Sequence, residues 1–377
     1  MPPSPSGLPA DPDDRFLFSE IRSTESAPQM MTRNWLNPSA VISSLVSMRF
    51  LVWIPLLLLG TFLPLRAAAD ENQEGTYLDP ATAPIDYQIQ GEYLGKAGEE
   101  SIRYGAQIIA LGKGKFRLVG YAGGLPGDGW DPATGKIEID GELQGEQAVF
   151  TSDLYEVRVS REGVLIPMSK ADGVARGELN RTVRRSPTLE AEPPSNATIL
   201  FDGGTAEAFS GGVLTPEKYL AADCESLAKF GDHTLHLEFM TPFKPEARGQ
   251  GRGNSGVYVQ SRYEVQVLDS FGLSGENNEC GGIYQIAAPK TNMCFPPLQW
   301  QTYDIEFVSA KYDAAGNKTS NARITILHNG VKIHDNLELP RHTPGRAAEG
   351  PELGGLYLQG HGNPVVYRNI WVVPSAS

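Results

Sequence analysis

The chain has 377 residues and a formal net charge of −13, from 32 Lys and Arg against 45 Asp and Glu. An acidic chain without Lys/Arg-rich runs is a poor partner for nucleic acid. The 40% apolar residues can build a core, and 20% charged residues are too few for a disordered chain. The length suits two domains. With 41 Gly and 28 Pro, the composition favours short strands joined by turns, and three Cys are too few for a disulfide-rich scaffold.

Residues 48–69 have the pattern of a secretory signal peptide. Arg49 precedes the apolar run 50–65, and three alanines at 67–69 supply a cleavage position. The run is interrupted by proline and glycine and is shorter than the ~20 residues that span a bilayer, which argues against a membrane anchor. We therefore expect cleavage near Asp70 and a secreted or periplasmic protein without membrane insertion. Residues 1–47 are interpreted as a disordered extension or as a mis-assigned start upstream of Met48.

Export also bears on the cysteines. Cys280 and Cys294 flank a short segment rich in Gly and Pro. An oxidising compartment would permit a bridge between them and leave Cys224 as a small buried residue.

The next region, 70–184, is predicted to be a small β-rich accessory domain. Short alternating segments from 87 to 183 are separated by Gly, Asp and Pro clusters at hairpin-like spacing. The region contains no His or Cys, so we expect no acid–base or metal chemistry there. A polar, Pro-rich linker is predicted at 185–197, followed by a second β-domain over 198–374 that holds all six histidines.

Several strands of the second domain have an aliphatic face and a polar face. Because strand side chains alternate, the polar residues of 234–240, 256–260, 263–267 and 355–359 point away from the core. These residues are His236, Glu238, Tyr258, Gln260, Glu264, Gln266, Tyr357 and Gln359, with His361 just beyond the last strand. If the strands share one sheet, these groups would form a concave wall able to bind sugar hydroxyls.

The segment from Glu264 to Asp269 is the most informative. Plain alternation puts Asp269 on the face opposite Glu264, but one β-bulge would bring Glu264, Gln266 and Asp269 to the same side. Two carboxylates flanking an amide suit acid–base chemistry at a glycosidic centre. The other interpretation is a solvated strand in which Asp269 begins a turn.

The second half resembles the 3-keto-disaccharide hydrolase family. The motifs ILFDGGT, GNSGVYVQSRYEVQVLDS, CGGIYQ, WQTYDIEF, HNGVKI and GGLYLQGHGNPVVYRNIWV follow in order between about 197 and 373. The resemblance implies a concanavalin A-like jelly-roll β-sandwich, export, and hydrolysis of glycosides whose sugar is oxidised at carbon 3. Two features depart from the family pattern: Gln301 stands where Asn is usual, and 249–253 (GQGRG) is an insertion that leaves the substrate in doubt.

Such substrates suggest a mechanism. A ketone at carbon 3 acidifies the hydrogen on carbon 2, so a base can remove it and expel the aglycone, after which water adds back. We expect Glu264 or His361 as base and Asp269 as acid. The residues expected to orient the sugar or stabilise the enolate are Gln266, Gln359 and Arg368, with Tyr284 as a further donor. Arg368 has an equal claim to a structural role, and no cofactor is expected, although a divalent metal beside Glu264, Asp269 and His361 is compatible with the sequence.

Two other functions fit the same residues. The spacing of Glu264, Gln266 and Asp269 echoes the E-x-D-x-x-E motif of laminarinase-like retaining glycosidases, although the central Gln and the final Asp argue against it. The domain could also be a non-catalytic carbohydrate-binding module. The aglycone, the linkage, the role of the accessory domain and the oligomeric state stay open.

Overall fold

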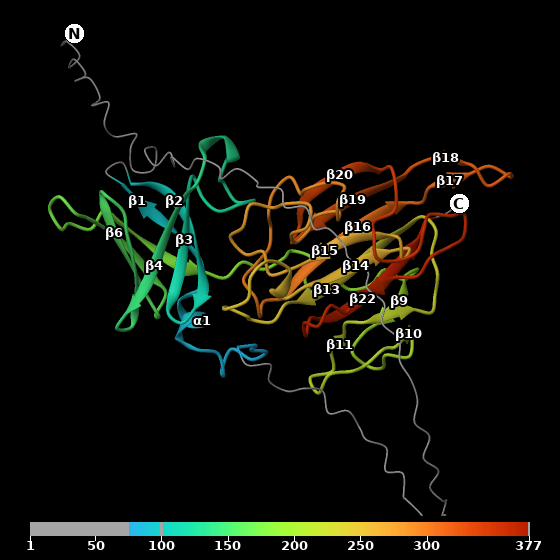
Figure 1. Ribbon diagram of the computed structural model, residues 1–377, viewed down its shortest axis with the longest axis horizontal. Helices are drawn as coiled ribbons and strands as arrows, with labels where there is room; N and C mark the ends of the chain where they lie inside the picture. The colour runs from blue at the N-terminus through green and yellow to red at the C-terminus, as the bar shows by residue number, and fades with distance from the viewer. Residues whose placement is uncertain (1–74, 99–100, 376–377) are drawn as a thin grey trace, which may run out of the picture. The chain divides into compact units, whose positions relative to one another are not determined.

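The structure is a computed structural model that describes residues 75–98 and 101–375 (Figure 1). The expected signal peptide and the extension before it lie outside the described residues. The described chain is nearly all β, which confirms the expected fold class. Its helical segments are α1 (Ile85–Ile89), η2 (Pro132–Thr134) and η3 (Gly249–Gly251). None of the helices in these residues is long and apolar enough to cross a membrane.

The first half forms a closed antiparallel barrel. Its strands are β1 (Gly91–Ala97), β2 (Ile102–Gly112), β3 (Lys115–Ala122), β4 (Ile137–Gln144), β5 (Gln147–Thr151), β6 (Tyr155–Ser160), β7 (Val164–Ser169) and β8 (Gly177–Thr182). Each strand pairs with the next, and β1 pairs with β8, so the barrel leaves no open edge. Tyr93, Phe116 and Phe150 are completely buried in its apolar cluster.

The second half is a β-sandwich of two antiparallel sheets (Figure 1). The five-stranded sheet contains, in spatial order, β10 (Phe209–Ser210), β12 (Cys224–Ser226), β21 (Tyr357–Leu358), β14 (Ser255–Val259) and β15 (Tyr263–Val267). The seven-stranded sheet contains β11 (Leu220–Ala221), β22 (Val366–Pro374), β13 (His233–Met240), β16 (Gln301–Val308), β19 (Ala322–His328) and β20 (Val331–Leu339), with β9 (Thr198–Phe201) paired to β22. A small hairpin joins β17 (Lys311–Tyr312) to β18 (Lys318–Ser320).

One apolar core lies between the two sheets. Leu235 and Leu237 of β13 share a cluster with Val257 of β14 and Val265 of β15. Burial of each such side chain stabilises the fold by ~1.5–3 kcal/mol. Because both inner faces are apolar, the alternating polar side chains of each sheet point outward, and the two outer faces of the sandwich point away from each other. The sandwich therefore has two separate polar faces, one on the outside of each sheet.

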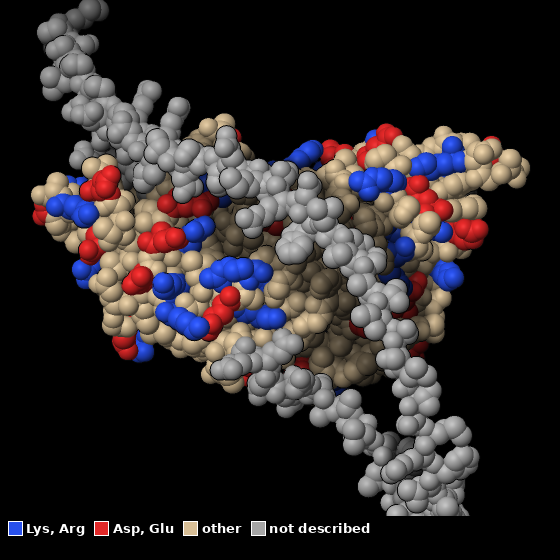
Figure 2. All heavy atoms as spheres, in the orientation of Figure 1, with Lys and Arg blue, Asp and Glu red and all other residues tan. Residues whose placement is uncertain are grey.

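Exposed charges contribute less. On the face seen in Figure 2, acidic and basic side chains are interspersed over the surface. Exposed ion pairs such as Arg117–Asp140 and Arg158–Glu156, both on the barrel, belong to a kind that stabilises a fold by ~1 kcal/mol or less. The apolar clusters, not these pairs, hold the fold together.

The segment expected to be a linker packs against the seven-stranded sheet. Ser186 Oγ lies 2.6 Å from Thr302 Oγ1, and Thr188 Oγ1 donates to Asp304 at 2.6 Å. Barrel and sandwich belong to one compact unit, and Phe271 of the sandwich lies in an apolar cluster with Ile109 and Val119 of the barrel.

Candidate functional site

A row of polar and aromatic residues crosses the outer face of the five-stranded sheet. Glu225, Tyr357, Tyr258 and Glu264 stand directly opposite one another on β12, β21, β14 and β15. The Tyr284 backbone N–H extends the row by donating to the Glu264 carbonyl at 3.3 Å. Residues opposite each other in antiparallel strands share a face and have Cβ atoms about 5 Å apart. The register therefore places Glu264 between two tyrosines.

Tyr258 is the direct partner of the Glu264 carboxyl group. Its hydroxyl lies 2.9 Å from Glu264 Oε2 and 3.1 Å from the Pro344 carbonyl oxygen. A phenol has one proton to donate. It can donate to Glu264 when the carboxyl is ionised, and to Pro344 while accepting from Glu264 when the carboxyl is protonated. The Glu264 carboxyl group thus has a hydrogen bond with Tyr258 in both its ionised and its protonated state.

The pKa of Glu264 fits a group that changes its protonation state near neutral pH. The residue is only 3% exposed, and burial raises its pKa to about 7, although the hydrogen bond from Tyr258 lowers the pKa in part. Burial and the neighbouring Glu264 raise the pKa of Tyr258, so the phenol stays protonated as a donor. A carboxyl group with this pKa can act as a base at neutral pH.

Gly256 makes room for that carboxyl group. It stands opposite Gln266, and its carbonyl accepts from the Gln359 N–H at 2.8 Å. A Cβ at this position would lie 2.5 Å from Glu264 Oε1, closer than real Cβ contacts allow, and 3.2 Å from Gln359 Oε1, which is a tight contact. Within the described residues Gln359 Oε1 is buried and has no hydrogen-bond partner. An unpaired buried oxygen is costly, and a donor group of a ligand would remove that cost.

An amide cluster continues the face beside Glu264. Gln266 Nε2 donates to Gln250 Oε1 at 2.9 Å and to Asn254 Oδ1 at 3.2 Å, and Asn254 Nδ2 donates to Gln250 Oε1 at 3.0 Å. Sequence reasoning did not select Gln250 or Asn254. Both precede β14. The signals for them are that Gln250 lies in the 249–253 insertion and that Asn254 lies at the start of the motif GNSGVYVQSRYEVQVLDS.

Asp269 is held by an arginine. Its Oδ2 accepts from Arg252 Nε at 2.7 Å, both side chains are buried, and its Oδ1 accepts from the Phe271 N–H at 3.3 Å. Val267 and Leu268 both lie in the sandwich core, so the alternation stops at the end of β15. Both Asp269 oxygens therefore already accept a hydrogen bond from the protein, and the carboxylate is paired with a buried arginine.

Two other expected site residues lie away from Glu264. His361 is exposed in the loop between β21 and β22, where its carbonyl accepts from Asn363 Nδ2 at 3.1 Å. No hydrogen bond joins its ring to another residue of the described chain. Gln260 lies in the turn after β14 with φ at 53°, and its Nε2 donates to the Phe230 carbonyl at 2.8 Å. It braces the turn.

Glu238 and Arg368 are on the other sheet. β13 and β22 belong to the seven-stranded sheet, so the expectation of one polar wall shared by all these strands was wrong. Arg368 Nε donates to Glu238 Oε2 at 2.7 Å, and Asn369 Nδ2 donates to Glu238 Oε1 at 3.0 Å. The Glu190 N–H also donates to Glu238 Oε1. The outer faces of the two sheets point apart, so neither residue can reach Glu264.

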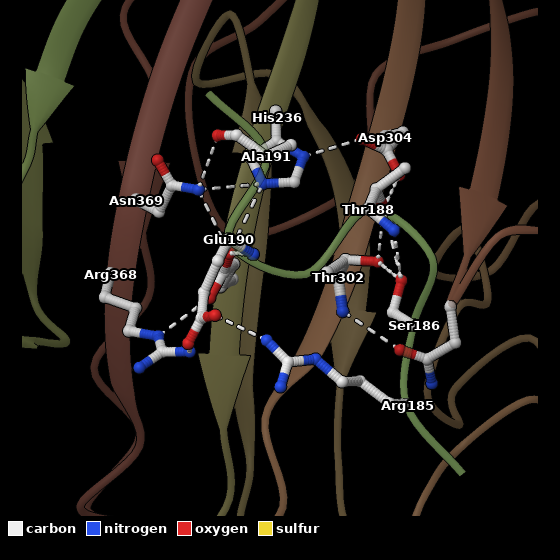
Figure 3. A network of polar contacts seen from close by, with 12 residues as sticks. Arg185, Ser186, Thr188, Glu190, Ala191, His236, Thr302, Asp304, Arg368 and Asn369 are labelled. Atoms are coloured by element: carbon white, nitrogen blue, oxygen red, sulfur yellow. Dashed lines mark hydrogen bonds and ion pairs between the residues drawn. The ribbon is translucent and has the colours of Figure 1, made fainter. Parts of the chain in front are cut away.

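Figure 3 shows the polar network on this sheet, in which linker residues such as Glu190 meet side chains such as His236 and Arg368. His236 Nδ1 lies 2.6 Å from Asp304 Oδ1, and its ring stacks on Trp371 at 4.9 Å. Burial alone would lower the pKa of His236, but hydrogen bonds to Asp304 and Glu238 raise it overall. For Glu238 burial would raise the pKa, but His236, Asn369, the Glu190 N–H and Arg368 lower it to about 2. This paired network attaches the linker to the sheet.

The described residues contain no cluster of three or more His, Cys, Asp or Glu side chains arranged to hold a metal ion. Cys224, Cys280 and Cys294 are buried and free.

The sandwich presents carboxyl, phenol and amide groups on the outer face of one sheet, and such groups can hydrogen-bond sugar hydroxyls. Residues 196–373 match the family model described as the 3-keto-alpha-glucoside-1,2-lyase-like domain, and this part of the chain is similar to that family. The match confirms the resemblance seen in the sequence, together with the jelly-roll fold it implied. It supports a glycoside hydrolase-like function for this domain.

Solved structures similar to this chain come from Parabacteroides distasonis ATCC 8503, each described as a candidate glycosyl hydrolase. One is 27% identical, covers 48% of this chain and 85% of its own, and has a TM-score of 0.45. A second is 16% identical, covers 48% and 95%, and has a TM-score of 0.35. A third is 20% identical, covers 51% and 98%, and has a TM-score of 0.31. No curated protein matches the chain.

Proposed function

We propose that the sandwich domain cleaves glycosides whose sugar is oxidised at carbon 3, by elimination followed by hydration, and that the protein works in the periplasm or outside the cell. The observation that carries the proposal is the Glu264 carboxyl group, buried beside Tyr258 and Gly256 with its pKa raised to about 7. The family description supports it, because it names a lyase of 3-keto-alpha-glucosides.

The reaction needs a base at carbon 2. The carbon 3 ketone stabilises the enolate that forms when Glu264 takes the carbon 2 proton. The electron pair then forms a double bond between carbons 1 and 2, the carbon 1–oxygen bond breaks, and the aglycone oxygen takes up a proton. Addition of water to this double bond gives the free 3-keto sugar, so the net change is hydrolysis. Proton transfer by a positioned carboxyl group contributes ~10²–10⁴-fold to such a step.

The neighbours of Glu264 supply the remaining functions. Tyr258 is a protonated donor beside the base and can stabilise the enolate oxygen or protonate the leaving oxygen. Gln359 presents an unpaired oxygen, and Tyr284 and Gln266 flank the base, so these residues would orient the sugar. His361, which is exposed in the loop between β21 and β22, is the alternative base.

The test compares a 3-keto glucoside with its unoxidised parent in D₂O, with hydrogen exchange at carbon 2 and aglycone release followed by ¹H NMR. We expect exchange and release with the 3-keto compound alone. Turnover of the parent would instead indicate an ordinary retaining glycosidase. Binding of both without turnover would indicate a carbohydrate-binding module.

Export has a separate test. A mature N-terminus near Asp70, measured by mass spectrometry on protein from the native host, would support a cleaved signal peptide. Protein that retains residues 1–69 in the cytoplasmic fraction would contradict it.

A further inference from the structure

One connection joins the barrel to the proposed site. Residues 241–254, here called the arm, link β13 in one sheet to β14 in the other and carry Gln250 and Asn254, the two amides that hold Gln266. The arm also contains the insertion 249–253.

The base of the arm is embedded in the barrel. The Phe243 backbone pairs with Tyr77 through hydrogen bonds of 2.9 and 3.0 Å, and its side chain is 0% exposed. Its ring lies 5.9 Å from that of Tyr77 and 5.3 Å from that of Tyr87. Phe243 belongs to the apolar cluster of the barrel, not to the core of the sandwich.

The middle of the arm is fixed to the end of β2 and the turn after it. Arg248 Nη2 donates to the Leu111 carbonyl at 2.7 Å, and Arg252 Nη1 donates to the Ala110 carbonyl at 3.2 Å. Glu246 Oε2 lies 2.8 Å from Lys113 Nζ in the β2–β3 turn. Three successive parts of the arm therefore contact one short stretch of the barrel.

The tip of the arm reaches the site. Arg252 pairs with Asp269, and Gln250 and Asn254 both accept from Gln266 Nε2. Gln266 lies on β15 two positions from Glu264 and on the same face. Because two arm oxygens hold Nε2, the orientation of the Gln266 amide depends on where the arm lies.

We propose that the barrel is a positioning element of the site: through Arg248 and Arg252 it holds the arm so that Gln250 and Asn254 orient Gln266 beside Glu264. Arg248 and Arg252 are positioning residues, since they touch the barrel and the arm but not the row of side chains around Glu264. This inference depends on the proposed function only in the test that measures turnover, because the hydrogen-exchange test needs no substrate. It gives the accessory domain a task that an independent module tethered by a linker would not have.

The first test uses the full chain and needs no substrate. Arg248→Ala removes the contact with Leu111, and Arg158→Ala is the matched control, an exposed barrel arginine paired with Glu156. We expect amide hydrogen exchange, measured by mass spectrometry, to rise about threefold or more in peptides spanning 249–256 and 263–269 in Arg248→Ala only. Peptides of β19 and β20 should not change. Unchanged exchange in the arm would overturn the proposal.

The second test measures turnover of the 3-keto glucoside in a double-mutant cycle. If Arg248 acts through the arm amides, Arg248→Ala lowers kcat several-fold in the native background and has little further effect in Gln250→Ala. Fully additive losses would contradict the inference. Should Arg248→Ala unfold by circular dichroism, Lys113→Ala breaks the neighbouring anchor at an exposed position. If the unmodified protein does not turn over the 3-keto glucoside, the proposed function fails, while hydrogen exchange still decides the role of the barrel.

Discussion

Two buried glutamates, one on each outer face of the sandwich, differ in what surrounds them. Glu264 is 3% exposed and Glu238 is 0% exposed. Burial alone would raise the pKa of both. The pKa of Glu264 rises to about 7, because within the described chain its carboxyl group is hydrogen-bonded by a single tyrosine hydroxyl. The pKa of Glu238 falls to about 2 beside His236, Asn369 and Arg368. The depth of burial thus does not identify a reactive carboxyl group. The number and charge of its partners do.

The largest expected difference between the two faces is in turnover. Glu264→Gln removes the proposed base and should lower kcat for a 3-keto glucoside about 10³-fold. Glu238→Gln is the matched control at equal depth on the other face, and should change kcat by less than about threefold where the protein stays folded. Steady-state release of the aglycone measures both. Similar losses of kcat in the two variants would contradict the assignment of the reactive carboxyl group to the face that carries Glu264.

The second prediction concerns stability, for which we expect Glu238 to matter more than Glu264. Glu238→Ala leaves Arg368 and the linker N–H of Glu190 without their carboxylate and should lower the free energy of unfolding by about 3–5 kcal/mol at pH 7. Because the folded pKa of Glu238 is depressed, the carboxylate stabilises the native state above the unfolded pKa, and this advantage is lost as the pH falls toward 2. Urea unfolding at several pH values measures it. Glu306→Ala, an exposed change on the neighbouring β16, should cost about 0.5 kcal/mol or less.

Glu264→Gln should stabilise the fold. The folded pKa of Glu264 is raised above its unfolded value, so the native state loses stability as the pH rises from about 4 to about 7. A neutral amide of the same shape avoids that loss and should add about 3 kcal/mol at pH 8 and almost nothing at pH 4. Denaturant unfolding at the two pH values would show the gain. A variant less stable than the native chain at pH 8 would argue against a raised pKa.

The smallest expected effect is a shift in a pH profile. The Tyr258 hydroxyl lowers the pKa of Glu264, so Tyr258→Phe should move the rising limb of kcat/KM to higher pH by about one unit or less. Tyr284→Phe is the control, because Tyr284 meets Glu264 through its backbone N–H. Tyr284→Phe should change the maximum value of kcat/KM but not the pH at which kcat/KM rises. A limb that stays fixed in Tyr258→Phe would mean that another group is the base.

Local features were predictable from the sequence, and long-range pairing was not. Alternation separated Tyr258, Glu264 and Gln266 from the aliphatic core, because side-chain direction in a strand depends only on neighbouring residues. Alternation does not say which strands share a sheet, and so Glu238 and Arg368 were expected on the wrong face. The closure of the barrel likewise depends on β1 pairing with β8 from the far end of the domain.

Loop residues were the least predictable part of the site. Gln250 and Asn254 reach Gln266 from a connection that has no periodicity, and the partner of Asp269 is an arginine in that same connection. Gln260 was assigned to an open strand face, but it occupies a turn with positive φ. Such contacts depend on where a loop packs, and neither spacing nor composition encodes that.

Titration of the two carboxyl groups by ¹³C NMR, with assignment from the spectra of Glu264→Gln and Glu238→Gln, measures the contrast most directly. We expect the resonance absent from Glu264→Gln to titrate near pH 7, and the one absent from Glu238→Gln to show no step above pH ~3. Titration of Glu264 at pH ~4, like that of an ordinary exposed glutamate, would contradict its assignment as the base.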